Sequence, residues 1–242
     1  MKIRDFVRES FNDFPGKIAS TVFVPGCNYN CPSCHAKHLL ERGENTSESD
    51  FFKYLNSREG WIEAVCISGG EPTLQLGLKF FAEKLKRRGL NVKLDTNGSD
   101  CVILGELLKE ELIDYVAMDV KSPLRLYAHA VGKGCINGGD YGKAINVVSQ
   151  FPDYEFRTTV VPIIRGDEKI SFMTVDEIRD TAKLISDYTD GSRTPRYFLQ
   201  PFVPRENGLL DARLENFPET PKKLLEEMRE AAKEYLPRCR IR

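Results

Sequence analysis

Short runs of β-branched and aromatic residues alternate along this chain with segments in which an apolar residue recurs at every third or fourth position. The β-branched runs are typical of strands and occupy residues 18–24, 62–68, 91–97, 115–120, 154–161 and 196–202. The periodic segments are typical of helices and include residues 74–89, 101–112, 141–151, 174–188 and 218–236. Alternation at about 40 residues per unit predicts an α/β fold with a parallel sheet and right-handed crossovers, either an open doubly wound sheet or a barrel.

Several of the expected helices have recognisable boundary signals. Thr174 is followed three residues later by Glu177, which is the spacing of a capping box. Thr220 stands directly before Pro221, a pair typical of the start of a helix. Residues 87–89, with the sequence RRG, place basic side chains and a glycine where a helix is expected to end.

Unusual residues follow the predicted strands one after another. In strand order they are Cys27 to Cys34, the GGEP stretch at 69–72, the DTNG stretch at 95–98, Asp119 with Lys121, Arg157 to Thr159, and Gln200. The carboxyl ends of parallel strands meet on one face of an α/β fold, and that face holds the ligands. We therefore expect these segments to form one site.

The first of these segments contains three cysteines, Cys27, Cys31 and Cys34, and no fourth nearby. Three thiolates in one loop can ligate three irons of a [4Fe–4S] cluster and leave the fourth iron without a protein ligand. A structural zinc site needs a fourth ligand, which His35 or His38 could supply, so zinc remains an alternative.

The remaining four cysteines are scattered along the chain. We expect Cys66, Cys101 and Cys135 to be small buried apolar residues and Cys239 to be exposed in the basic tail. In a reducing compartment an odd number of cysteines, seven here, favours a metal or redox site over a disulfide framework.

Length and charge limit the other possibilities. A chain of 242 residues is within the size of one α/β domain, so we expect a single domain over residues 1–242. The net charge of -1 gives no general attraction to nucleic acid or anionic lipid, so we expect neither as a partner. The N-terminal sequence carries charges throughout and no segment is apolar enough for a membrane span, which predicts a cytoplasmic protein.

Five motifs in order resemble those of the radical S-adenosylmethionine (SAM) enzymes, and within them the activating enzymes of glycyl radical enzymes. The motifs are DFPGKIASTVFVPGCNYNCPSCH, ISGGEPTLQ, KLDTNGS, YVAMDVKSP and EFRTTVVP. They look like the activases of the anaerobic ribonucleotide reductase and pyruvate formate-lyase type. The resemblance covers nearly the whole chain and implies a partial (β/α)6 TIM-like barrel with its site at the C-terminal ends of the strands.

The resemblance implies a role for each motif. Cys27, Cys31 and Cys34 would ligate the [4Fe–4S] cluster, whose open iron binds the amino and carboxylate groups of SAM. Gly69, Gly70 and Glu71 would hold the amino end of the methionine part, and Asp119 and Lys121 would bracket its carboxylate and the ribose. Arg157 would contact the nucleoside, and Asp95 and Thr96 would help to hold a monovalent cation beside the cosubstrate.

Other residues of the same motifs complete the expected SAM site. They are Ser33, His35, Asn97 and Gln200. Ser33 stands where the family usually has an aromatic residue beside the adenine, so only its backbone is expected to contact the base. Gln200 has an equally good interpretation as a hydrogen-bonded amide of the core.

The resemblance also implies a reaction and partners. Reductive cleavage of SAM would give methionine and a 5′-deoxyadenosyl radical, which removes a hydrogen from a glycine on a loop of a partner glycyl radical enzyme. The electron would come from a donor of the flavodoxin or ferredoxin type. One alternative is a short-barrel radical enzyme that rearranges a pterin into a deazapurine precursor, and another is a non-catalytic scaffold that binds zinc or a cluster.

Overall fold

The computed structural model describes residues 1–40, 43–132, 138–189, 191, 194–204 and 208–242. Its strands are β1 (Asp5–Ser10), β2 (Ala19–Val24), β3 (Ala64–Gly69), β4 (Asn91–Thr96), β5 (Tyr115–Asp119), β6 (Asp153–Val160), β7 (Pro162–Ile164), β8 (Ile170–Phe172), β9 (Arg196–Pro201) and β10 (Cys239–Ile241). Its α-helices are α1 (Lys37–Leu40), α2 (Glu48–Ser57), α3 (Leu78–Lys86), α4 (Cys101–Lys109), α5 (Tyr127–Val131), α6 (Gly138–Ser149), α7 (Val175–Tyr188) and α8 (Lys222–Lys233). Short 3-10 turns lie at Pro72–Leu74, Leu124–Leu126 and Ala212–Leu214.

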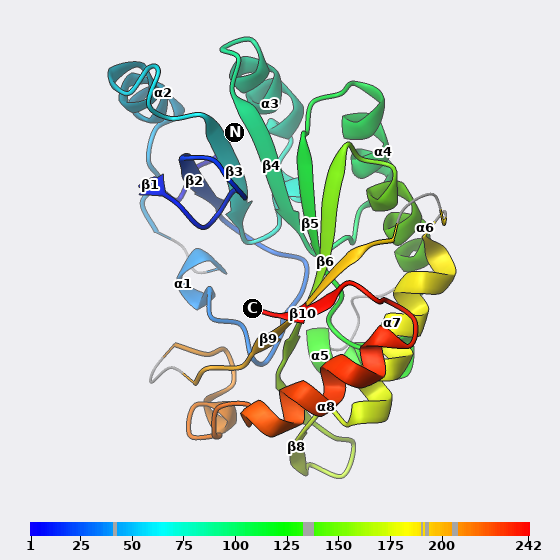
Figure 1. Cartoon of the computed structure of the whole chain (residues 1–242). Coiled ribbons are helices and arrows are strands. Elements are labelled where there is room, and N and C mark those ends of the chain that lie inside the picture. The colour runs from blue at the N-terminus through cyan, green and yellow to red at the C-terminus, as the bar shows by residue number, and fades with distance from the viewer. Residues whose placement is uncertain (41–42, 133–137, 190, 192–193, 205–207) are drawn as a thin grey trace.

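The main sheet confirms the predicted α/β fold and its partial barrel. Its strand order is β1-β2-β3-β4-β5-β6-β9-β10, and every neighbouring pair is parallel except β1 with β2. The six predicted strands correspond to β2, β3, β4, β5, β6 and β9. Among the described residues β1 and β10 are the two edges, so the sheet stays open (Figure 1).

Helices cover the outer face of this sheet. Helices α4, α6, α7 and α8 pack against one another in that order along it (Figure 1). On β4, Val92 and Leu94 belong to the buried core beneath these helices. Side chains alternate along a strand, so Lys93 and Asp95 point to the inner face. The inner face of the barrel therefore carries the charged residues.

The inner face is closed at its amino-terminal end by apolar side chains. Phe14 packs against Tyr115 with ring centroids 5.7 Å apart, and three small residues surround the pair: Ala19, Ala64 and Ala117. The open part of the lumen is therefore at the carboxyl ends of the strands.

The boundary signals were partly right. Thr174 forms the predicted capping box with Glu177 at the start of α7. Gly89 follows α3 with φ +74°, as the predicted end of that helix requires. Thr220 and Pro221 stand directly before α8, as predicted for the start of a helix, and Pro221 is the N-cap. The Thr220 hydroxyl does not cap the helix, because it donates to Val160 O and accepts from Phe202 N, each at 2.8 Å.

Three groups of elements were not expected from the sequence: the edge strands β1 and β10, the antiparallel hairpin of β7 and β8, and the short helices α1, α2 and α5. The prediction that Cys239 is exposed was wrong, since it is 2% exposed and pairs with Tyr197 between β10 and β9. Cys66 is buried as predicted, Cys101 is only partly buried, and Cys135 lies outside the described residues. Within the described chain, no helix has the length and apolar character needed to cross a membrane.

Candidate functional site

A cavity of about 250 Å³ opens at the carboxyl ends of β3, β4, β5 and β6. This volume is close to the lower limit of about 300 Å³ for small-molecule pockets. The predicted residues that line it are Cys27, Cys31, Ser33, Cys34, His35, Gly69, Gly70, Glu71, Asp95, Thr96, Asn97, Asp119, Lys121 and Arg157. Gln200 is the one predicted site residue outside this lining. The structure thus brings the remaining motifs together as the strand-end argument predicted.

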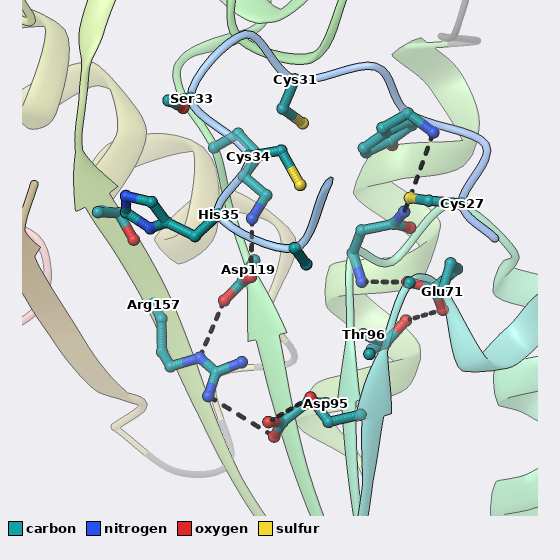
Figure 2. Close-up of a pocket in the computed structure, with 18 of the residues that line it drawn as sticks. Cys27, Cys31, Ser33, Cys34, His35, Glu71, Asp95, Thr96, Asp119 and Arg157 are labelled. Carbon is teal, nitrogen blue, oxygen red and sulfur yellow. Dashed lines mark hydrogen bonds and ion pairs between the residues drawn. The ribbon is translucent and has the colours of Figure 1, made fainter. Parts of the chain in front are cut away.

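The cysteine loop forms one wall of the cavity, and its three sulfur atoms face the same space (Figure 2). None of these thiols is in a disulfide. Two backbone bonds shape the loop: Cys34 N donates to Cys31 O at 3.0 Å, and Asn30 N donates to Val131 O at 2.9 Å. The side chain of Tyr29 is buried beside the ring of Tyr127 and so anchors the middle of the loop.

Burial governs the acidity of the loop thiols. It raises the pKa of Cys27, and it raises the pKa of Cys31 to about 11 although Lys121 opposes the effect. A metal centre binds thiolates and releases their protons, so iron would have to displace a proton from Cys31.

The side chains around the cavity fit a four-iron cluster better than a zinc ion. Within the described residues no three His, Cys, Asp or Glu side chains converge closely enough to hold one metal ion. The ring of His35 is stacked on Phe202, with centroids 5.9 Å apart, and His38 is exposed. The structure therefore gives no support to zinc. A four-iron cluster takes one thiolate on each of three irons, so three separate thiols around one cavity fit it.

The two glycines of the GGEP stretch bring β3 close to the cysteine loop. Gly69 has φ +119°, and a Cβ there would lie 2.4 Å from Val24 N. A Cβ on Gly70 would lie 1.8 Å from Gly26 O. The sequence suggested that the lack of a side chain at these glycines lets a ligand approach. In the structure it lets the backbone around Val24 and Gly26 approach.

Glu71 is buried, and protein groups donate to both of its carboxylate oxygens. Oε1 accepts from Thr73 N at 3.1 Å, from Thr73 Oγ1 at 2.7 Å and from Thr96 Oγ1 at 2.7 Å. Oε2 accepts from Asn97 N at 2.7 Å (Figure 2). Burial raises the pKa of Glu71, and these donors oppose the rise. Glu71 therefore fixes the end of β4 against β3.

Asn97 extends this connection to the cysteine loop. Its Nδ2 donates to Asn28 Oδ1 at 3.0 Å and approaches Cys27 Sγ at 3.7 Å. The DTNG stretch is therefore in contact with the first cysteine.

Asp119 and its two cations form the opposite wall. Lys121 Nζ donates to Asp119 Oδ2 at 2.7 Å, and Arg157 Nε donates to Asp119 Oδ1 at 2.9 Å (Figure 2). Burial alone would raise the pKa of Asp119, but the charges of Arg157 and Lys121 hold it well below its usual range. Burial alone would lower the pKa of Lys121, and Asp119 raises it to about 12. All three groups are therefore charged at neutral pH.

Arg157 also reaches Asp95, with 3.6 Å between Arg157 Nη1 and Asp95 Oδ1. Asp95 accepts a hydrogen bond from Ser68 Oγ at 3.2 Å and another from the ammonium of Lys93. Sequence reasoning missed both donors. Ser68 directly precedes Gly69 on β3, and Lys93 lies two residues before Asp95 on β4. Because side chains alternate between the two faces of a strand, this spacing could have identified them as inward-facing.

Comparison with known proteins agrees with this geometry. The sequence profile of the Radical SAM superfamily matches residues 21–185. A protein of Methanocaldococcus jannaschii named "Putative glycyl-radical enzyme activating enzyme" is 32% identical over 240 residues, which cover 95% of this chain and 91% of that protein. A 7-carboxy-7-deazaguanine synthase of Thermoplasma acidophilum is 31% identical over 98 residues, which cover 40% of this chain and 44% of that protein.

The fold is also found among solved structures. The crystal structure of Streptococcus suis SuiB bound to S-adenosylmethionine superposes with a TM-score of 0.64 at 12% identity and covers 92% of this chain and 51% of that one. At this level of identity the likeness concerns the fold.

Proposed function

We propose that this chain, which belongs to the radical SAM superfamily, activates a glycyl radical enzyme by cleaving SAM at a [4Fe–4S] cluster held by Cys27, Cys31 and Cys34. The observation that carries the proposal is the composition of the cavity. Among the described residues that line it, the three thiols are the only cysteines and face a wall of paired charges, so a charged molecule can bind beside an iron that is open to it. When bound, the cluster and SAM supply the radical chemistry.

The residues of the chain bind and orient the cosubstrate. SAM carries a carboxylate, an amino group and a sulfonium, and the cavity offers both signs of charge to meet them. The charge of Lys121 acts on the thiols of Cys27 and Cys31, so we assign Lys121 to the carboxylate. Oε2 of Glu71 accepts one hydrogen bond, from Asn97 N, and retains capacity for the amino group.

The length of the similarity favours an activase over an enzyme acting on a small molecule. The relative named as an activating enzyme matches along 95% of this chain, whereas the deazaguanine synthase matches along 40%. The open sheet leaves a lateral entrance, which a glycine-bearing loop of a partner protein requires. A donor of the flavodoxin or ferredoxin type would supply the electron.

The test begins with anaerobic reconstitution of the protein with iron and sulfide. After reduction with dithionite in the presence of SAM, we expect 5′-deoxyadenosine by mass spectrometry. With a glycyl radical enzyme encoded beside this chain, we expect a glycine-centred radical by electron paramagnetic resonance. Deoxyadenosine without a glycyl radical in that partner would reject the activase and leave the deazapurine-type reaction as the candidate. Absence of deoxyadenosine would reject both.

A further inference from the structure

Lys93 is a buried lysine on the inner face of the barrel, only 4% exposed. Its ammonium donates to Asp95 Oδ1, lies 3.6 Å from the thiol of Cys66, and lies 5.8 Å from the ring centre of Tyr115. Burying an ammonium is costly unless a charged partner compensates it. Burial alone would lower the pKa of Lys93, but the charge of Asp95, its hydrogen bond with Lys93 and the nearby Cys66 together raise it. Lys93 is therefore a permanent positive charge beside Asp95.

The resemblance to activases implies that Asp95 and Thr96 hold a monovalent cation, and the structure does not fit that role. Asp95 already accepts from Lys93 and Ser68, and Arg157 lies 3.6 Å away. Thr96 Oγ1 donates to Glu71 at 2.7 Å and accepts from Gly98 N at 3.1 Å. Both expected oxygen ligands thus already have protein partners, and those of Asp95 include the positive charges of Lys93 and Arg157.

The charges of the wall lead to the same conclusion. Asp95 and Asp119 are paired with three cations, Lys93, Lys121 and Arg157, while Glu71, the third carboxylate of the cavity, accepts from Thr73, Thr96 and Asn97 instead. An added monovalent cation beside Asp95 would be repelled by the ammonium and the guanidinium that already lie there. Coulomb interactions of this kind are strong in a partly buried site.

We propose that Lys93 is a built-in cation that positions Asp95 at the SAM site, so that this chain binds SAM without a monovalent metal ion. The proposal rests on the proposed function for the identity of the ligand. Lys93 acts through Asp95, and is therefore a positioning residue. The ammonium of Lys93 thus takes the place beside Asp95 that a sodium or potassium ion from solution would have.

The first experiment compares SAM binding by the reconstituted wild-type protein in potassium chloride and in choline chloride at equal ionic strength. We expect dissociation constants within about twofold of each other, a difference of less than about 0.5 kcal/mol. A loss of about tenfold or more in choline would overturn the proposal.

The second experiment uses Lys93→Met, which keeps the stem and removes the charge. In choline we expect SAM binding to weaken by about tenfold, and potassium to restore it partly by taking the place of the ammonium beside Asp95. The melting temperature of the cluster-free variant should rise with potassium relative to choline, while that of the wild type should not. The double variant Lys93→Met with Asp95→Asn removes both charges and should lose this response, and the variant Lys109→Met, at an exposed lysine of α4, should behave as wild type.

The proposal would also be overturned if Lys93→Met had the same SAM dissociation constant and the same melting temperature as the wild type in both salts. If Lys93→Met does not fold, the wild-type comparison decides alone. Failure of the wild type to bind SAM in any salt would refute the proposed function. The comparison of melting temperatures in potassium and choline would still test whether Lys93 replaces a metal ion, because it needs neither cluster nor cosubstrate.

Discussion

The Cys31 thiol is partly buried and lies near the charge of Lys121, and burial is the stronger influence on its pKa. A protonated thiol in this place is a poor ligand, so cluster assembly must supply the free energy of deprotonation. The other two cysteines of the loop lie around the same cavity. Each of the three is therefore expected to be needed for a stable cluster.

Changing Cys31 to Ala should abolish the intact cluster, because one iron loses its only protein ligand. Iron and sulfide analysis after anaerobic reconstitution checks this, with about four of each expected per wild-type chain. Cys101→Ala, at the start of α4 outside the cavity, is the matched control and should retain the full content. Full iron content or SAM cleavage in Cys31→Ala would show that the ligand set is wrong.

Residue by residue, the sequence predicted the site well wherever a side chain lies at a strand end. Cys27, Thr96 and Asp119 follow that rule, and the parallel sheet brings their ends together. Lys93 was missed because a lysine on a strand is usually exposed, although its separation of two residues from Asp95 places both on the same face of β4. Gln200 was misplaced because a position on β9 does not specify how far the strand reaches toward the cavity.

At the scale of elements, the contact between the end of β3 and the cysteine loop sets the shape of the site. Gly70 N donates to Val24 O at 2.9 Å, and Glu71 N donates to Gly26 O at 2.8 Å. These bonds are possible because neither glycine of the GGEP stretch has a side chain toward the loop. The loop is therefore held by backbone contacts as well as by its own turn.

Gly70→Ala should displace the cysteine loop, because the new Cβ would lie 1.8 Å from Gly26 O. We expect a loss of about 2–3 kcal/mol in the free energy of unfolding, together with reduced cluster content. Urea unfolding and iron analysis measure the two effects.

Gly105→Ala is the control for this substitution. Gly105 lies within α4, and a Cβ there meets nothing within 4 Å. Alanine should stabilise the helix by up to about 1 kcal/mol. Equal stability of Gly70→Ala and wild type would show that the close approach of loop and strand is not required.

The elements that the sequence did not predict share a physical reason. β1 and β10 lie at the edges, where pairing on one side is enough and a long apolar run is not needed. β10 is three residues long and its sequence resembles a charged tail. It forms a strand because it pairs with β9, and the sequence of the segment alone does not show this pairing. The central strands were predictable because β-branched, aromatic and other apolar residues recur along each of them.

For the molecule as a whole, Arg242 connects the β10 edge to the interior. Arg242 Nη1 and Nη2 donate to Glu155 Oε1 and Oε2 at 2.7 and 2.9 Å, and Tyr115 donates to Glu155 at 2.6 Å. Burial alone would raise the pKa of Glu155, but hydrogen bonds from Arg242 and Tyr115 outweigh it and lower the pKa. The charged form of Glu155 therefore stabilises the folded state.

Arg242→Met should lower the free energy of unfolding at pH 7 by roughly 2 kcal/mol, because it removes the charged partner of Glu155. The loss is moderate, since Arg242 is half-exposed and solvent already screens part of the interaction. The contribution of Glu155 is complete above its unfolded pKa of about 4.3 and is lost as pH falls through its lower folded value. The difference between wild type and variant should therefore shrink below about pH 4. Urea unfolding at several pH values tests this, with exposed Arg240→Met as the control. A difference that stays constant down to low pH would contradict the assignment.

The open sheet has two unpaired edges, and edges of this kind can act as templates for strand addition and aggregation. Each edge here has a protecting feature. The exposed positions of β1 include the charged Arg8 and Glu9, and its register with β2 shifts between Val7 and Ser10. The opposite edge, β10, offers only three residues. The barrel can thus remain open for a ligand or partner without presenting a long, flat edge to a second copy of itself.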